Sequence, residues 1–384
     1  MSFLLIRFSI VSLLLLSSFT FAQTPLLPVP PLLAASSYIL MDAKTGEIIV
    51  QYNADEQLAP ASLTKMMTAY IAEVQLNSGI LSLTDEVLIS EKAWRTGGSK
   101  MYVEWNSKVS VDDLLHGIII QSGNDASVAL AEYIAGDEVV FAQLMNQYAA
   151  QLGMNNSHFK NATGLPDKGH VSTAHDLAIL ARAIINHDPQ FYKIYSQQSF
   201  EYNNIKQNNR VTLLRDDPSV DGLKTGHTEE AGYCLVVSAK KEQTRFIAVV
   251  MGTESKAART TESKKLLNYG FSFFESATLV KSYEVLTSAR VWKGVTQNIN
   301  IGVLQPINKT IQKGTTKLHT TEITINSGLM APILKGDILG QLTITLEDKI
   351  IHQQSVVALN DVKQAGFFAR LWDSVKLFFI GLFK

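Results

Sequence analysis

The stretch Pro60-Ala61-Ser62-Leu63-Thr64-Lys65-Met66-Met67-Thr68 places a serine and a lysine at the start of a helical pattern. Residues three apart on a helix share a face, so Ser62 and Lys65 are predicted to lie side by side. A serine hydroxyl beside a lysine that burial can deprotonate is a candidate nucleophile with its base. The helical pattern itself consists of apolar residues at Leu63, Met66, Met67, Tyr70 and Val74.

A second motif, Ser122-Gly123-Asn124, interrupts another apolar helical stretch between residues 114 and 135. The Ser122 hydroxyl can pass a proton between Lys65 and a leaving amine, and the Asn124 carboxamide can hold a substrate amide. The alternative is a turn that caps the helix over 125–135, for which serine and asparagine are also suitable. The two interpretations are compatible.

A third motif, Lys224-Thr225-Gly226, is expected at the end of a strand. There Lys224 adds positive charge, Thr225 can bind a carboxylate, and Gly226 lets a substrate approach the backbone closely. Each motif alone is weak, since an isolated Ser-x-x-Lys is usually an ordinary surface pair. The three in this order favour serine acyl transfer.

Composition argues against several other classes of function. The formal net charge of −1 speaks against a nucleic-acid partner. The single cysteine, Cys234, cannot form an internal disulfide, and its apolar neighbours predict packing in a buried strand. The 8 histidines are scattered, and the close pair His170 and His175 has no cysteine pair to complete a site. No metal and no cofactor are predicted.

These motifs resemble those of the low-molecular-mass penicillin-binding proteins that act as D-alanyl-D-alanine carboxypeptidases, serine peptidase family S11. The resemblance rests on residues 60–68, 121–126 and 220–228, and extends over the mature chain. It implies an α+β fold: a penicillin-binding/β-lactamase-like transpeptidase domain, with an antiparallel sheet flanked by helices, then a small all-β domain and a C-terminal amphipathic helix. It also implies that Ser62 attacks the terminal D-alanyl-D-alanine bond of a peptidoglycan stem pentapeptide and is acylated by β-lactams.

The resemblance assigns further residues to substrate binding. Backbone N–H groups of Ser62 and His227 are expected to form an oxyanion hole, each donor contributing about 3 kcal/mol. Arg210 and Arg259, together with Thr225, are expected to bind the terminal carboxylate of the substrate. The alternative for both arginines is an ordinary surface charge.

One position departs from the pattern of some relatives, which hold histidine where this chain has Thr163. Histidine there has been linked to fast deacylation in the family, so the rate of this step is left open. The nearby His170 and His175 are expected on the surface of the loop.

The expected organisation is a signal peptide over 1–22, a leader tether over 23–35, a catalytic domain over 36–276, a small β-rich domain over 277–360 and an amphipathic membrane-anchor helix over 361–384. The first segment has one basic residue, a short apolar run and Thr20-Phe21-Ala22 as a cleavage site, with an uncleaved anchor as the alternative. In the last segment, aromatic and aliphatic residues face one side, which favours a membrane interface over docking on the protein's own core. By resemblance, the location is the periplasm, on the outer face of the bacterial inner membrane.

Two rival functions fit part of the sequence pattern. A class A β-lactamase uses similar motifs but needs a glutamate before the third motif, and residues 154–176 contain none. Such an enzyme also lacks the extra domain and carries Ser-Asp-Asn where this chain has Ser-Gly-Asn. A non-catalytic wall-binding scaffold is the other rival, and the retention of each catalytic residue type argues against it. Endopeptidase activity on cross-links stays open.

Overall fold

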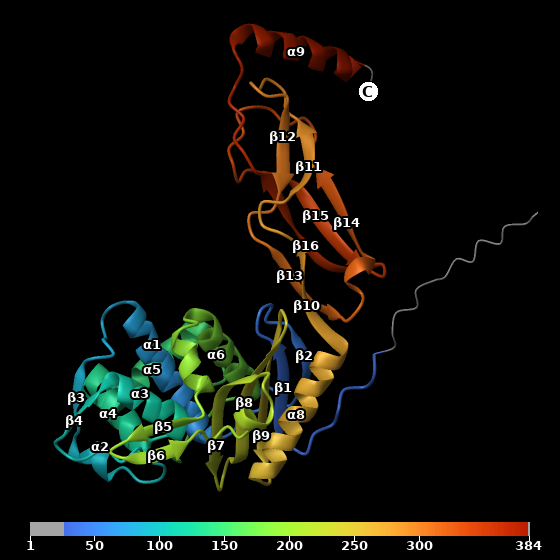
Figure 1. Ribbon diagram of the computed structural model, residues 1–384. Coiled ribbons are helices and arrows are strands. Elements are labelled where there is room, and N and C mark those ends of the chain that lie inside the picture. Colours follow the sequence, from blue (N-terminus) through green and yellow to red (C-terminus); the bar gives the residue numbers. More distant parts are fainter. Residues whose placement is uncertain (1–26, 383–384) are drawn as a thin grey trace, which may run out of the picture.

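The computed structural model describes residues 27–382. Figure 1 shows a wide domain of helices and one sheet, an elongated β domain that rises from it, and a terminal helix at the far end of the β domain. The expected signal peptide lies outside the described residues. The described part of the leader runs over the first domain, where Tyr269 Oη donates a hydrogen bond to the Pro28 carbonyl at 2.9 Å and Leu33 is buried.

The first domain is organised around a five-stranded antiparallel sheet with the order β2-β1-β9-β8-β7. β-Branched and aromatic residues favour these strands. Helix α8 packs on one face, while α1 and α6 lie on the other, so the sheet separates two hydrophobic cores. The bounds are β1 Ser37–Asp42, β2 Ile48–Tyr52, β7 Val220–Thr228, β8 Gly232–Lys241, β9 Thr244–Thr253 and α8 Lys256–Phe273.

The helical part of this domain covers the sheet face opposite α8. Every residue of α1 from Lys65 to Glu73 is buried, as are the first eight residues of α4. The helices are α1 Lys65–Asn77, α2 Glu91–Arg95, α3 Val111–His116, α4 Asn124–Ala135, α5 Glu138–Leu152 and α6 Ala174–His187. The short α7, Leu213–Asp216, packs instead in the core on the α8 side. Two small two-stranded sheets complete the domain: β3 Glu86–Leu88 with β4 Lys108–Ser110, and β5 Ser199–Tyr202 with β6 Ile205–Asn208. The first two motifs therefore lie at the N-termini of helices buried in one core.

The second domain consists of strands around a third hydrophobic core. Strand β10 follows α8 directly and pairs with β13, while a five-stranded sheet has the order β11-β12-β16-β15-β14. Its strands are β10 Phe274–Val280, β11 Val285–Arg290, β12 Asn298–Gly302, β13 Ile307–Gln312, β14 His319–Ile325, β15 Ile338–Leu346 and β16 Lys349–Ala358. The predicted α+β class with an additional all-β domain is confirmed.

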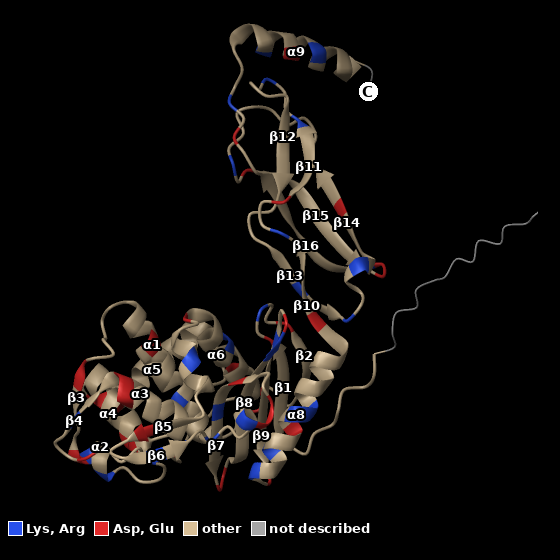
Figure 2. Ribbon diagram, in the orientation of Figure 1, with Lys and Arg blue, Asp and Glu red and all other residues tan. Residues whose placement is uncertain are grey.

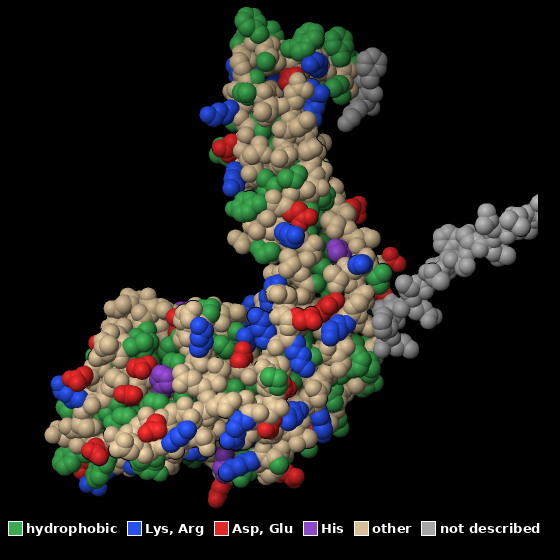
Figure 3. Space-filling model, in the orientation of Figure 1, with side chains coloured by type: hydrophobic (Ala, Val, Ile, Leu, Met, Phe, Trp, Pro, Cys, Tyr) green, Lys and Arg blue, Asp and Glu red, His purple; other side chains and the backbone are tan. Residues whose placement is uncertain are grey.

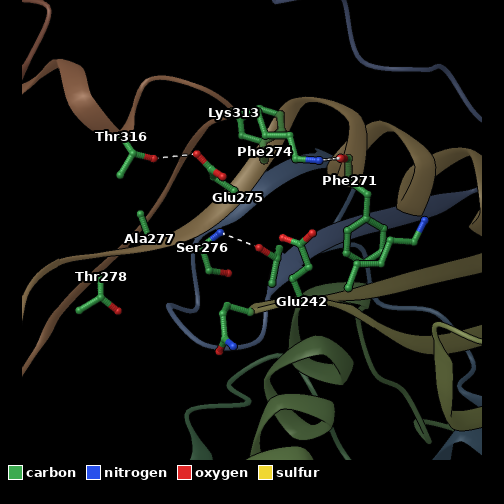
Figure 4. Close-up of a pocket in the computed structure, with 12 residues that line it drawn as sticks. Glu242, Phe271, Phe274, Glu275, Ser276, Ala277, Thr278, Lys313 and Thr316 are labelled. Carbon is green, nitrogen blue, oxygen red and sulfur yellow. Dashed lines mark hydrogen bonds between the residues drawn. The ribbon is translucent and has the colours of Figure 1, made fainter.

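Polar contacts join the two domains. The buried Asp42 carboxylate accepts hydrogen bonds from Ser276 Oγ at 2.5 Å and Thr310 Oγ1 at 2.9 Å. Glu47 pairs with Lys309 at 2.7 Å, and Figure 2 shows charges of both signs at this junction. A cavity of about 380 Å³ lies beside these contacts, where Glu275 accepts a hydrogen bond from Thr316 (Figure 4). No predicted site residue lines it.

The terminal helix is shorter than the expected segment, because α9 spans Phe367–Leu382. The preceding residues stay with the β domain: Val362 is buried and its backbone exchanges hydrogen bonds with Ile333. In α9 itself no residue is buried, and Figure 3 shows hydrophobic side chains along it. Among the described residues, no helix has both the length and the apolar character needed to span a bilayer.

Candidate active site

Ser62 lies in a short 3₁₀ helix, Ala61–Thr64, that leads directly into α1. Lys65 Nζ donates a hydrogen bond to Ser62 Oγ at 3.0 Å and a second to the Thr163 carbonyl at 2.5 Å. The pair predicted from helical spacing is therefore in direct contact. The Lys65 side chain is 1% exposed, so its amine is held in place and shielded from bulk water.

Burial, followed by the positive charge of Arg210, lowers the pKa of Lys65 to about 7, while the charge of Asp125 opposes the shift. A charged amine loses hydration when buried, and a nearby cation disfavours its protonated form. A substantial fraction of Lys65 is therefore neutral near pH 7. A neutral amine 3.0 Å from Ser62 Oγ can accept the hydroxyl proton.

The second motif follows a π-helical turn, Gly117–Gln121, and Ser122 has a left-handed backbone with φ of 67°. The N-cap of α4 is Gly123, with no side-chain cap, so neither Ser122 nor Asn124 serves the capping role left open above. Ser122 Oγ is buried and has no hydrogen-bond partner among the described residues. Its hydroxyl is thus available to a substrate.

Asn124 is oriented by the loop that precedes the second motif. Its Nδ2 donates to the Gly97 carbonyl at 2.7 Å, while its buried Oδ1 has no partner in the described part of the chain. This arrangement leaves an acceptor that suits a substrate N–H. Asp125, to which no sequence motif assigned a role, accepts hydrogen bonds from the backbone N–H groups of Met101 and Tyr102, each at 2.9 Å.

The third motif lies within β7 and not at its end, since the strand continues to Thr228. The β7 strand packs against the 3₁₀ helix of Ser62, and Gly226 makes this approach possible. A Cβ at Gly226 would lie 3.0 Å from the Pro60 carbonyl oxygen and 3.2 Å from Leu63. A glycine is therefore needed at position 226 because the segment that carries Ser62 packs directly against the β7 backbone there.

The site is rich in positive charge. Lys224 is 2% exposed, and burial, followed by the charges of Lys65, Arg210 and Arg259, lowers its pKa well below the ordinary value. Thr225, which is also buried, lies next to it on the strand. The guanidinium groups of the two arginines stay charged and create a potential that favours an anionic ligand.

The two arginines reach this region from different elements. Arg210 Nε donates to the Gln121 carbonyl at 2.8 Å, directly before the second motif. Arg259, from α8, is buried and donates to the Gly226 carbonyl at 3.1 Å, so it also braces the third motif. The exposed His227 ring stacks on Tyr233 at 3.9 Å. Arg259 is therefore not the surface charge of the alternative interpretation, while Arg210 is exposed and is held by its hydrogen bond to Gln121.

The loop that carries Thr163 corrects one expectation. His170 is 5% exposed, not on the surface, and its Nε2 lies 2.8 Å from Thr64 Oγ1. Burial lowers the pKa of His170 to about 4, so the ring is neutral and structural. His175, by contrast, is partly exposed and lies 3.0 Å from Asp55. The contact with Thr64 spans 106 residues, and no local pattern could reveal it.

Cys234 is fully buried in β8, and burial raises the pKa of its thiol to about 11. A thiol with such a pKa stays protonated and unreactive at neutral pH. The predicted packing role is confirmed.

Comparisons with known proteins agree with this geometry. Residues 24–255 match the family model of D-alanyl-D-alanine carboxypeptidases, and residues 274–364 match that of the C-terminal domain of penicillin-binding protein 5. The D-alanyl-D-alanine carboxypeptidase DacA of Haemophilus influenzae is 42% identical over 92% of each chain, and DacC of Escherichia coli is 41% identical over 91% of this chain and 89% of the relative.

Solved structures give the same result. Penicillin-binding protein 5 from Haemophilus influenzae superposes with a TM-score of 0.83 at 41% identity, over 88% of this chain and 100% of that chain. Penicillin-binding protein D2 from Listeria monocytogenes, solved in its ampicillin-bound form, has a TM-score of 0.58 at 30% identity and covers 62% of this chain and 98% of its own. The chain therefore belongs to the D-alanyl-D-alanine carboxypeptidases, the serine hydrolases of the penicillin-binding family.

Proposed function

We propose that Ser62 is the nucleophile that forms the acyl-enzyme and that Lys65 is its base. The observation that carries this assignment is the 3.0 Å contact between Lys65 Nζ and Ser62 Oγ, within a site that lowers the pKa of Lys65 to about 7. Lys65 takes the hydroxyl proton as Ser62 Oγ bonds to the carbonyl carbon between the two terminal D-alanines. The proton then passes through Ser122 to the departing nitrogen as the peptide bond breaks, which releases D-alanine.

Water completes the cycle. A water molecule attacks the ester carbonyl and gives its proton to Lys65. The ester bond to Ser62 then breaks, Lys65 returns that proton to Ser62 Oγ, and the shortened peptide leaves. The developing oxyanion is assigned to the backbone N–H groups of Ser62 and His227, which lie on segments that pack together. The same attack by Ser62 on a β-lactam carbonyl opens the ring and leaves a covalent adduct.

Recognition of the substrate terminus rests on charge. The free carboxylate of the last D-alanine is assigned to Thr225 and Arg210, within the cationic cluster that also contains Lys224. Arg259 contributes positive charge and supports the Gly226 carbonyl. The Asn124 Oδ1 accepts a substrate N–H, which orients the peptide along β7.

Intact-mass spectrometry with benzylpenicillin tests the mechanism. The mature protein is expected to gain one penicillin mass and to release D-alanine from a pentapeptide ending in D-alanyl-D-alanine, and Ser62→Ala to do neither. Ser127→Ala, a buried serine on α4 that bonds to the Gly123 carbonyl, is the matched control and should keep the adduct. The adduct lifetime reports deacylation with Thr163 in place. An adduct on Ser62→Ala would refute the assignment.

Location is a separate proposal: the protein is exported to the periplasm and α9 holds it on the inner membrane. The support is the leader sequence and the uncovered apolar side chains of α9, among them Phe368 at 83% exposure and Trp372 at 63%. Flotation with phosphatidylethanolamine–phosphatidylglycerol vesicles should bind the mature chain but not one that ends at Gly366. Equal flotation of both would contradict the proposal.

A further inference from the structure

An exposed group of aromatic side chains lies beside the active site and has no role in the reaction above. Trp94 is 39% exposed, Trp105 59% and Tyr102 51%. The two indole rings stack on each other, with centroids 6.4 Å apart and planes inclined by 29°. We call these three residues the aromatic patch. Exposed aromatic groups of this kind mark binding surfaces.

The aromatic patch is fastened to the catalytic motif itself. Asn124 binds the loop that follows α2 through two hydrogen bonds. Its backbone N–H donates to the Ser99 carbonyl at 2.7 Å, and its Nδ2 donates to the Gly97 carbonyl. Asp125 holds the N–H of Tyr102, whose φ of 68° is unusual for a tyrosine. Motif and patch therefore form one rigid unit, and a ligand on the patch is placed relative to Ser62.

Tyr102 connects the aromatic patch to the substrate end of the site. Burial lowers the pKa of Arg210, and the neighbouring Tyr102 phenol raises it, so the two side chains are close. The two tryptophans lie farther out, at the end of the α2 segment and on the loop after it. In Figure 1, α2 and α9 lie at opposite ends of the molecule, so Trp94 on α2 lies far from the terminal helix.

Size and composition identify the kind of ligand. Three aromatic rings offer a few hundred Å² at about 150–250 Å² each when fully covered, whereas a stable protein interface needs about 800 Å² from each partner. Charged groups border the rings: Arg95 lies over Trp94 at 5.5 Å and pairs with Glu91 at 2.7 Å. Flat apolar faces with hydrogen-bonding groups at their edge suit a sugar ring, which has C–H groups on its faces and hydroxyls around it.

We propose that the aromatic patch is a saccharide subsite, which binds the polysaccharide that carries the stem peptide while Ser62 acts on the peptide. This inference rests on the proposed function, because it assumes a peptide substrate attached to a glycan. The more exposed indole of Trp105, backed by Trp94, stacks on a pyranose ring, and Arg95 and Glu91 bond to the hydroxyls of the sugar. Tyr102, which lies near Arg210, is the residue of the aromatic patch nearest to the peptide-binding part of the site.

The test compares two substrates that share one peptide: a free pentapeptide ending in D-alanyl-D-alanine, and the same pentapeptide attached to soluble glycan strands. In the variant Trp94→Ala/Trp105→Ala, KM for the glycan-linked substrate is expected to rise about tenfold or more, with turnover of the free peptide unchanged. The matched control is Tyr52→Ala. Tyr52 is an exposed aromatic residue that stacks on Tyr38 and lies in β2, at the sheet edge farthest from β7. Trp94→Phe/Trp105→Phe should restore part of the affinity.

Fluorescence titration with tetra-N-acetylchitotetraose measures the subsite without catalysis. The chain has 4 tryptophans, and the wild-type emission should change on binding while that of the double alanine variant should not. An unchanged KM for the glycan-linked substrate, or equal losses on both substrates, would overturn the subsite. Failure of wild type on the free pentapeptide would instead refute the proposed function, and the titration would still decide the subsite.

Discussion

Lys65 is the residue whose protonation should control the rate of acylation. Because burial and the charge of Arg210 lower its pKa to about 7, the reactive neutral form grows as pH rises towards that value. The rate constant for acylation by benzylpenicillin should rise about tenfold per pH unit below 7 and level off above it. Stopped-flow measurements from pH 5 to 9 check this profile.

Two variants sharpen the Lys65 prediction. Lys65→Arg keeps its proton throughout this range and should lose at least about 10³ in rate. Arg210→Gln removes a cation that disfavours the charged amine, so the inflection should move to higher pH. A rate independent of pH in wild type would show that Lys65 is not the base.

Glu73 is a second residue whose ionisation matters, here for stability. It is 1% exposed, and burial together with the charge of Asp188 raises its pKa to about 8. The folded state thus holds this proton up to about pH 8, while the unfolded chain releases it near 4.5. Stability should therefore fall by roughly 2 to 4 kcal/mol as pH rises from 5 to 9.

Urea unfolding of the catalytic domain in Glu73→Gln measures how much Glu73 contributes to the pH dependence of the free energy of unfolding. The amide does not titrate, so the variant should lose less stability than wild type on going from pH 5 to pH 9. Glu229→Gln, an exposed glutamate, is the control and should follow wild type. Parallel pH profiles for wild type and Glu73→Gln would contradict the prediction.

At the scale of elements, the site depends on the close packing of a loop against the 3₁₀ helix of Ser62. Gly164 has φ of 79°, and a Cβ there would lie 1.8 Å from the Ala61 carbonyl oxygen. Gly164→Ala should displace the Ser62 segment and slow penicillin acylation about 10²-fold or more. Acylation kinetics with a thermal melt measure both effects.

Gly169→Ala separates the two causes. Gly169 has a similar φ of 82°, but its nearest atom to an added Cβ is a Lys160 carbon at 3.8 Å. This variant carries the backbone strain without the collision and should keep most of the acylation rate. Equal losses in both variants would show that backbone strain, and not contact with Ala61, determines the effect.

At the scale of the whole molecule, Asp42 couples the two domains. Its carboxylate accepts hydrogen bonds from Ser276 and Thr310 of the β domain and from the backbone N–H of Lys44 at 2.8 Å. Asp42→Ala should remove about 2 to 5 kcal/mol of stability, since hydrogen bonds to a buried charge are strong. Small-angle scattering should then show a broader range of domain orientations.

Turnover of the free pentapeptide by Asp42→Ala should stay close to wild type, because the β domain contributes no residue to the assigned site. Asp55→Asn, an exposed carboxylate paired with His175, is the control for scattering. A scattering profile identical to wild type would mean that other junction contacts, such as Glu47 with Lys309, hold the domains by themselves.

Much of the fold followed from local patterns. The helix after Ser62, the break at Ser122 and the strands that carry Lys224 and Cys234 were predicted because periodicity and turn residues act over a few positions. The bounds were less accurate, as at the end of β7 and at the start of α9, where tertiary hydrogen bonds override the local pattern.

The sequence by itself determined the chemistry that is available: a Ser–Lys pair at helical spacing, two later motifs in order, and an apolar terminal helix. Tertiary structure alone decided how that chemistry is tuned. Lys65 donates a hydrogen bond to a carbonyl 98 residues away, and His170 bonds to the Thr64 hydroxyl. Arg259 of α8 donates a hydrogen bond to the Gly226 carbonyl of β7. The physical reason is that desolvation and charge, which lower the pKa of Lys65, depend on groups that only folding brings together.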